Sequence, residues 1–207
     1  MRDSLNWGII GTGAIADDFC EALEKSTQCR VVGAVGSSID KSRAFGRKWG
    51  LSSQATTLPE LLADTSVEVI YVATPHPSHE VQAVACIEAG KHVLCEKPIT
   101  VDAKSAARVI GAARARGVFL MEAFMYRCHP LLGQALALLK DGAIGPIRHV
   151  RADFGFKVPR HPEGRLFKPA LGGGSILDVG CYTVSFARLI AGVESGQPAC
   201  EPTKLVA

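Results

Sequence analysis

The sequence has no CxxC pair, no run of basic residues and no uninterrupted apolar stretch of the roughly 20 residues that a membrane helix requires. Its seven cysteines are odd in number and show no metal-ligand spacing, which argues against a disulfide framework or a zinc ribbon and favours reduced thiols in the cytoplasm. The polar N-terminus lacks the basic and apolar regions of a secretory signal. A net charge of +3 is too small to indicate nucleic acid as a partner. We therefore expect a soluble protein with neither a membrane nor a nucleic-acid partner.

Short apolar strands alternate with helical patterns over the first part of the chain. The predicted strands are residues 7–10, 30–35, 67–73, 92–95 and 118–121. The predicted helices are residues 14–25, 42–49, 58–63, 78–89 and 103–116. Strands and helices that alternate in this way form parallel βαβ units. The fold class is therefore α/β, with an N-terminal doubly wound Rossmann sheet in a domain of residues 1–125.

The pattern changes after Met121. A helix is expected at residues 130–141, an alternating strand at 147–156, and a helix from the glycines at 172–174 to about Ala191. The last four residues resemble the start of another strand. One strand, one helix and a strand stub do not complete a domain. Residues 126–207 are therefore expected to form the incomplete start of an α+β sheet domain, in a chain truncated on its C-terminal side.

A phosphate-binding turn is predicted between the first strand and the first helix. Residues 11–16 (GTGAIA) match the G-x-G-x-x-A pattern, in which Gly11 permits a tight turn and Gly13 lets the backbone approach a pyrophosphate. The helix that follows offers free N–H groups to an anion. The alternative, a glycine turn without a ligand, is disfavoured by this strand–turn–helix context. The predicted cofactor contacts are Gly11, Thr12, Gly13, Ala14 and Ile15.

The end of the second strand distinguishes NAD from NADP. An NAD site usually places an acidic residue there, whereas this chain has Ser37 and Ser38, followed by Lys41 and Arg43. Hydroxyls and cations suit a 2′-phosphate, so NADP is favoured over NAD and Ser37, Ser38 and Arg43 are predicted to bind it. The alternative is that the two cations are only solvated residues at the start of a helix.

Two further segments lie at the carboxyl ends of predicted strands, where open α/β sheets bind their ligands. They are residues 73–79 (ATPHPSH) and 95–98 (CEKP). His76 and His79 have metal-ligand spacing but no third ligand nearby, so we predict no metal site. The predicted cofactor contacts in these segments are Thr74, Pro75, His76, His79, Glu96 and Lys97.

These segments, together with residues 172–182 (GGGSILDVGCY), resemble the glucose-fructose oxidoreductase/inositol dehydrogenase family. Residues 119–124, 151–156 and 169–174 are most similar to its dihydrodiol dehydrogenase and NADP-dependent xylose dehydrogenase branch. The resemblance implies a Rossmann domain followed by a sheet domain that covers the nicotinamide and often forms a subunit interface, so we expect a homo-oligomer at full length. The chain departs from the family at His76, where asparagine is common. Many members also have histidine at the position of Tyr182, where the dihydrodiol branch has tyrosine.

Alcohol oxidation needs a hydride acceptor and a base for the hydroxyl proton. Tyr182 is the candidate base, since a nearby ammonium such as that of Lys97 would favour its phenolate. Asp178 lies four residues earlier, on the same face of the predicted helix. The resemblance implies that Lys97, Asp178 and Tyr182 are the catalytic residues. Taken singly, they could instead be an ion-pair partner of Glu96, a polar helix residue and a packing tyrosine.

The sequence thus predicts an NADP-dependent dehydrogenase that transfers a hydride between the nicotinamide and a CH–OH group of a sugar or a vicinal diol. Phe124 and Arg127 are candidates for lining the substrate pocket, although packing explains them equally well. The alternative is a catalytically impaired fragment or sensor protein that binds the dinucleotide without turnover. This chain by itself is expected to bind NADP weakly and to turn over poorly.

Overall fold

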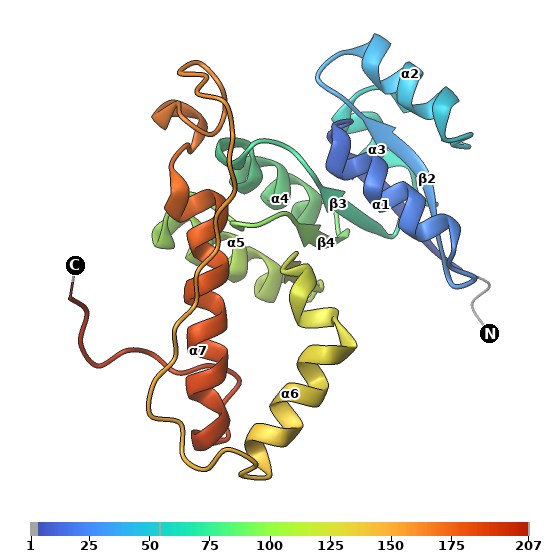
Figure 1. The fold of residues 1–207 in the computed structure, drawn as a ribbon. Coiled ribbons are helices and arrows are strands. Elements are labelled where there is room, and N and C mark those ends of the chain that lie inside the picture. The colour runs from blue at the N-terminus through green and yellow to red at the C-terminus, as the bar shows by residue number, and fades with distance from the viewer. Residues whose placement is uncertain (1–3, 54, 207) are drawn as a thin grey trace. The chain divides into compact units, whose positions relative to one another are not determined.

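The computed structural model describes residues 4–53 and 55–206, which form two compact units. The first unit contains the residues up to Ala123 together with Ala170–Gly172, and the second contains Phe124–Pro169 and the residues from Gly173 onward. In Figure 1 the part of the first unit up to Ala123 runs from blue to green, and the second unit contains the yellow helix α6 and the red helix α7. The sequence analysis placed the boundary after residue 125, and residues 170–172 were not expected in the first unit.

The first unit is built on a five-stranded parallel sheet with the strand order β2-β1-β3-β4-β5 (Figure 1). Its strands are β1 (Leu5–Ile10), β2 (Cys29–Val35), β3 (Val69–Val72), β4 (His92–Cys95) and β5 (Leu120–Glu122). The order confirms the predicted doubly wound sheet. The chain leaves β1 toward β2 on one side and returns to β3 on the other, so the switch point lies between β1 and β3. Ligands of such sheets bind at the carboxyl ends of the strands that flank this point.

Helices cover both faces of the sheet. They are α1 (Ala14–Glu24), α2 (Ile39–Lys48), α3 (Leu58–Ala63), α4 (His79–Glu88) and α5 (Ala103–Arg116). Ala16, Cys20 and Phe45 of α1 and α2 belong to one buried cluster with Ile9 and Tyr71. The side chains of α3, α4 and α5 belong to a second buried cluster, with Ile70 and Val93 of the sheet. Burial on both faces explains why β3 reads as a continuous apolar run.

Local signals set the ends of several helices. The Ser38 side chain accepts a hydrogen bond from the Lys41 N–H at 3.3 Å, and α2 therefore begins at Ile39, three residues before the predicted start. Asp102 caps α5 in the same way, through the Ser105 N–H at 2.8 Å. Gly117 ends α5 in the left-handed conformation, as predicted from its position. Polar caps and glycine thus position the connections that carry the functional segments.

The second unit is helical in the part of the chain that the structure describes. Its elements are η2 (Met125–Cys128), α6 (Pro130–Lys140), the π-helix η4 (Ile176–Gly180) and α7 (Cys181–Ser195). The expected strand at residues 147–156 is wrong, because the structure contains no strand in this segment. Its alternation of apolar and polar residues suits a strand with one buried face. A strand also needs a neighbour for its backbone hydrogen bonds, and no other described segment of this unit supplies one. Residues 204–206 form no strand either, and residue 207 lies outside the described residues.

One helical stretch, Pro169–Ser195, is long and apolar enough to cross a membrane by length and composition, among the residues described. The mean hydropathy of its 18-residue window is 1.5, and Asp178, Arg188 and Glu194 interrupt the stretch. The core helices of soluble domains meet the same criterion. Length and hydropathy alone therefore assign no membrane segment here.

Alkaline pH is expected to destabilise the first unit through its buried thiols. Burial raises the pKa of the Cys86 thiol to about 12. An unfolded thiol ionises near pH 8.5, so the contribution of Cys86 to stability is complete below that pH and is lost as pH rises toward 12. The loss amounts to about 1.4 kcal/mol per pH unit for each such thiol.

Urea unfolding at pH 7.5 and at pH 10 measures this effect. The free energy of unfolding should fall less between the two pH values for Cys86→Ala than for the wild type. The exposed Cys128 provides the control, because Cys128→Ala should lose as much free energy of unfolding as the wild type. An equal loss in all three proteins would contradict the prediction.

Candidate functional site

The fold requires only one of the two glycines in the turn after β1. Gly11 has a φ of +106°, and a Cβ there would lie 2.4 Å from the carbonyl oxygen of Ala73 at the end of β3. The fold itself therefore requires Gly11. Gly13 precedes α1 with a φ of −91°, and a Cβ there would meet no atom within 4 Å. The folded chain thus leaves open space beside Gly13, at the β1 side of the switch point, where a pyrophosphate would approach.

The first turn of α1 faces this open space with unused backbone donors. Ala14 and Ile15 begin the helix and are exposed, and the first N–H groups of any helix have no partner within it. Ala16 is fully buried, which lets α1 approach the sheet closely. A dinucleotide pyrophosphate fits this arrangement, because it needs donors, a positive helix end and room for its oxygens.

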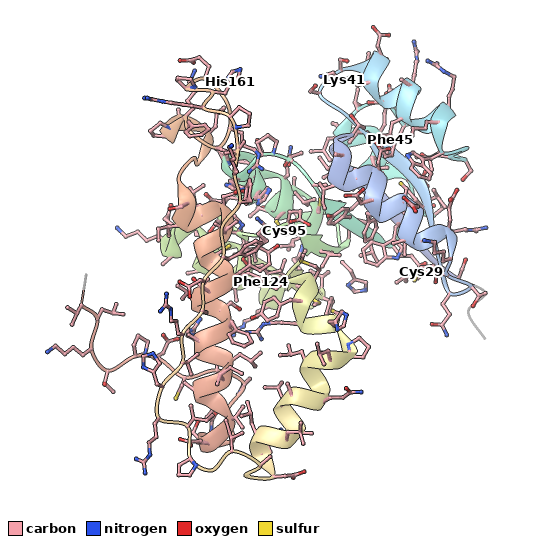
Figure 2. The ribbon with its side chains drawn as sticks, viewed as in Figure 1. Cys29, Lys41, Phe45, Cys95, Phe124 and His161 are labelled. Atoms are coloured by element: carbon pink, nitrogen blue, oxygen red, sulfur yellow. The ribbon has the colours of Figure 1, made fainter. Side chains whose placement is uncertain are left out.

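Hydroxyls and a cation come together where β2 ends and α2 begins. The Lys41 ammonium donates to the Ser37 hydroxyl at 3.1 Å, and Ser38 caps the helix. A Cβ on Gly36 would lie 2.8 Å from the Thr12 hydroxyl and 3.0 Å from the Lys41 Cβ. Lys41 at the start of α2 and Phe45 further along the same helix are labelled in Figure 2. Thr12, Ser37 and Lys41 therefore form one small polar cluster beside the glycine turn.

Arg43 lies elsewhere. It follows Lys41 by two residues, which places it on the opposite side of α2. There it lines a surface cavity of about 780 Å³ together with Arg47, Thr56 and Glu60. The structure therefore brings Lys41, rather than Arg43, to the serine pair, and the role predicted for Arg43 stays a prediction that this placement does not favour.

Ser42 was not identified from the sequence, although it holds the loop after β2. It is buried, and its hydroxyl oxygen lies 2.9 Å from the Gly36 nitrogen, which donates to it. The same hydroxyl lies 3.0 Å from the carbonyl oxygens of Ser38 and Thr56. A serine inside a polar helix gives no sequence signal for such a role.

The loop after β3 is anchored by its two histidines. His79 is fully buried, with Nδ1 2.8 Å from the Pro98 carbonyl oxygen and Nε2 2.7 Å from that of Thr74. It therefore ties the loop after β3 to the loop after β4. His76 is also buried, and its Nδ1 lies 3.2 Å from the Gly172 carbonyl oxygen. These contacts show both histidines fixing backbone geometry, whereas Pro75 is exposed at the loop surface.

The loop after β4 is held by two residues that the sequence analysis missed. The Tyr71 hydroxyl donates to Glu96 Oε1 at 2.6 Å, and the Lys97 backbone N–H donates to Glu96 Oε2 at 3.1 Å. The Ile99 N–H donates to Glu122 Oε1 at 2.7 Å. The Lys97–Pro98 peptide bond is cis. Two sequence signals could have identified these residues. Tyr71 is a tyrosine in an otherwise aliphatic strand, and Glu122 is an acidic residue at the end of β5.

Tyr182 lies in an aromatic group of the second unit. Its ring packs edge-on against Phe124 and Phe154, each with a centroid distance of 5.4 Å, and its hydroxyl donates to the Met125 sulfur at 3.4 Å. Figure 2 labels Phe124 within this group, and Phe124 is buried. Phe124 and Phe154 therefore both lie beside Tyr182, and the role of Phe124 in lining a substrate pocket stays a prediction.

Asp178 and Arg127 have partners within the second unit. Arg165 forms an ion pair with Asp178 at 2.9 Å, and the Asp178 residue is largely buried. Asp178 belongs to the π-helix η4, whose wider turn interrupts the regular helix on which one shared face with Tyr182 was expected. Arg127 donates to the Ser185 hydroxyl at 3.2 Å and packs on Tyr126. Lys97 belongs to the first unit, so its meeting with Asp178 and Tyr182 stays a prediction.

Comparisons with known proteins show the family to which the chain belongs. Residues 5–124 match the model of the "Oxidoreductase family, NAD-binding Rossmann fold", and residues 133–198 match that of the "GFO/IDH/MocA C-terminal domain". Trans-1,2-dihydrobenzene-1,2-diol dehydrogenases from Mus musculus and Homo sapiens are 37% and 35% identical over 92% and 91% of this chain. The alignments cover 57% of both relatives, so the chain spans little more than half of their length.

Solved structures give the same assignment. A 3-ketoreductase from Actinomadura kijaniata, in complex with NADP and TDP-benzene, is 32% identical with a TM-score of 0.79, over 91% of this chain and 57% of that one. An aldose-aldose oxidoreductase from Caulobacter crescentus, complexed with glycerol, is 29% identical with a TM-score of 0.83, over 93% and 58%. With a matching family model over more than half of its residues, the chain belongs to the GFO/IDH/MocA family of oxidoreductases with an NAD-binding Rossmann fold.

Proposed function

We propose that the complete protein is an NADP-dependent oxidoreductase that transfers a hydride between the nicotinamide and a CH–OH group of a sugar or a vicinal diol. The observation that carries the proposal is the pair of glycines at the switch point. Gly11 is required by the fold, whereas the open space at Gly13 serves no packing purpose and fits an approaching pyrophosphate. The names of the relatives, which act on dihydrodiols, keto groups or aldoses, support the substrate class.

The choice of NADP rests on the cluster beside the glycine turn. Lys41 and Ser37 lie within hydrogen-bond distance of each other, and residues 35–38 contain no acid that would bind ribose hydroxyls. An ammonium and two hydroxyls suit a phosphate on the 2′ oxygen. The ketoreductase relative was crystallised with NADP, which supports the same choice.

The bound NADP would supply the hydride acceptor, and the residues of the chain would manage the proton. Tyr182 would accept the substrate hydroxyl proton at its phenolic oxygen, and the Lys97 ammonium would favour the phenolate. Asp178, held by Arg165, would orient substrate hydroxyls as an acceptor. Phe124 and Phe154 beside Tyr182 offer an apolar wall for the carbon face of a ring-shaped diol or sugar. A cytoplasmic location is proposed as well, because an odd number of cysteines without a CxxC pair argues against a disulfide framework.

Parallel fluorescence titrations with NADPH and NADH test the cofactor assignment. We expect the chain to bind NADPH more tightly than NADH, and Lys41→Gln to reduce this preference by about tenfold, because the charge beside the 2′-phosphate is lost. Arg47→Gln removes the same charge from the cavity between α2 and α3 and should leave the preference intact. Equal affinities in the wild type would refute the NADP assignment. Binding of neither nucleotide would contradict the proposed function for this chain.

A further inference from the structure

We propose that Tyr71 is a positioning residue of the cofactor site, and that it acts by fixing the Glu96 carboxylate toward the nicotinamide ribose. The proposal rests on the proposed function, because it requires a dinucleotide at this edge of the sheet. Glu96 directly follows β4, next to Lys97, and Tyr71 lies on the neighbouring strand β3. The Tyr71 hydroxyl donates to Glu96 Oε1 at 2.6 Å.

The Tyr71 ring is held rigidly, so its hydroxyl has a defined position. The residue is only 3% exposed. Its ring stacks on Phe19 of α1 with a centroid distance of 4.2 Å, and Phe19 in turn packs edge-on against Trp7 of β1 at 5.2 Å. Three elements of the first unit thus fix this side chain. A carboxylate bonded to such a donor cannot rotate freely, since rotation would break a charge-assisted hydrogen bond.

Packing alone does not explain a tyrosine at this position. The stack with Phe19 uses only the ring, which phenylalanine would also supply. The hydroxyl group adds a polar atom to a buried strand, and such a group is costly unless it has a partner. Glu96 is that partner. Burial and the neighbouring Glu96 carboxylate raise the pKa of Tyr71 well above its ordinary value, so the hydroxyl remains a donor at physiological pH.

The bonded carboxylate keeps acceptor capacity for a ligand. A carboxylate offers roughly four lone-pair sites, and the Tyr71 hydroxyl and the Lys97 N–H each occupy one. Ribose hydroxyls are donors that suit the remaining sites. Because Glu96 lies at the carboxyl end of β4, its free lone pairs belong to the edge where a sheet of this order binds its ligand.

Tyr71→Phe tests the proposal with two ligands. It removes the hydroxyl and keeps the ring. We expect the Kd for NADPH to rise by about three- to tenfold, because Glu96 loses the donor that orients it. Adenosine 2′,5′-bisphosphate lacks the nicotinamide ribose, so its Kd should stay unchanged. In the Glu96→Gln background, Tyr71→Phe should add no further loss, since the two residues act as one unit.

Phe45→Leu is the matched control. It disturbs the buried cluster that contains Tyr71 but keeps the stack of Tyr71 on Phe19 and both partners of the hydrogen bond, so it should lower the free energy of unfolding and leave the ratio of the two Kd values near that of the wild type. An equal loss for both ligands in Tyr71→Phe would show a merely structural role and overturn the proposal, as would an unchanged Kd for NADPH or additive effects with Glu96→Gln. A wild type that binds the bisphosphate but not NADPH would also overturn it. A wild type that binds none of the nucleotides would overturn the proposed function and this inference together.

Discussion

Gly11→Ala is expected to abolish dinucleotide binding, with a loss of at least about 100-fold in NADPH affinity, and to destabilise the first unit. The added Cβ would lie 2.4 Å from the Ala73 carbonyl oxygen, and the φ of +106° is one that alanine rarely adopts. Either β1 and β3 must separate or the turn must change its conformation. Strain of this kind costs about 1–3 kcal/mol before the steric clash is counted. Urea unfolding and NADPH titration measure the two effects.

Gly13→Ala separates the needs of the fold from those of the ligand. Its Cβ would meet no atom of the protein within 4 Å, so the free energy of unfolding should change by no more than about 1 kcal/mol. The same methyl group would occupy the space that the pyrophosphate needs, so the Kd for NADPH should rise by about tenfold or more. Wild-type affinity in Gly13→Ala would falsify the assignment of this turn to a dinucleotide, even if Gly11→Ala behaved as expected.

Tyr182→Phe is expected to lower turnover by about 10²- to 10⁴-fold in a form of the protein that oxidises a sugar or a diol, because the base that accepts the hydroxyl proton is lost. The Kd for NADPH should stay near its wild-type value, since the glycine turn and the Ser37–Lys41 pair belong to the other unit. Steady-state kinetics and cofactor titration together measure these effects.

Tyr126→Phe is the matched control for this prediction. It removes a hydroxyl from the same aromatic group, where Tyr126 lies 2.8 Å from the Ser185 hydroxyl. It should lower the free energy of unfolding by about 1 kcal/mol and keep most of the turnover. If Tyr182→Phe retained the turnover of Tyr126→Phe, the proton would have to be accepted elsewhere and the assignment of the base would be lost.

The sequence by itself determined the doubly wound sheet and the location of the glycine turn. Apolar runs of a few residues, each followed by an amphipathic helix and a glycine or polar cap, are local signals, and β1 and α5 lie close to where these signals place them. Gly11 was recognisable because its conformation is available to few other residues. Where the local signal and the tertiary contacts agreed, prediction succeeded.

Only the tertiary structure decided which side chains meet. Tyr71 and Glu96 are 25 residues apart, and His79 reaches Pro98 across 19, so their pairing depends on strand order rather than on any local pattern. Helix geometry placed Lys41 beside Ser37 and Arg43 at a separate cavity, although the sequence analysis had chosen Arg43 as the phosphate contact. The strand expected at residues 147–156 did not form, because a segment becomes a strand only when another backbone pairs with it. Periodicity specifies which face of a segment is apolar, whereas pairing and side-chain contacts follow from the assembled fold.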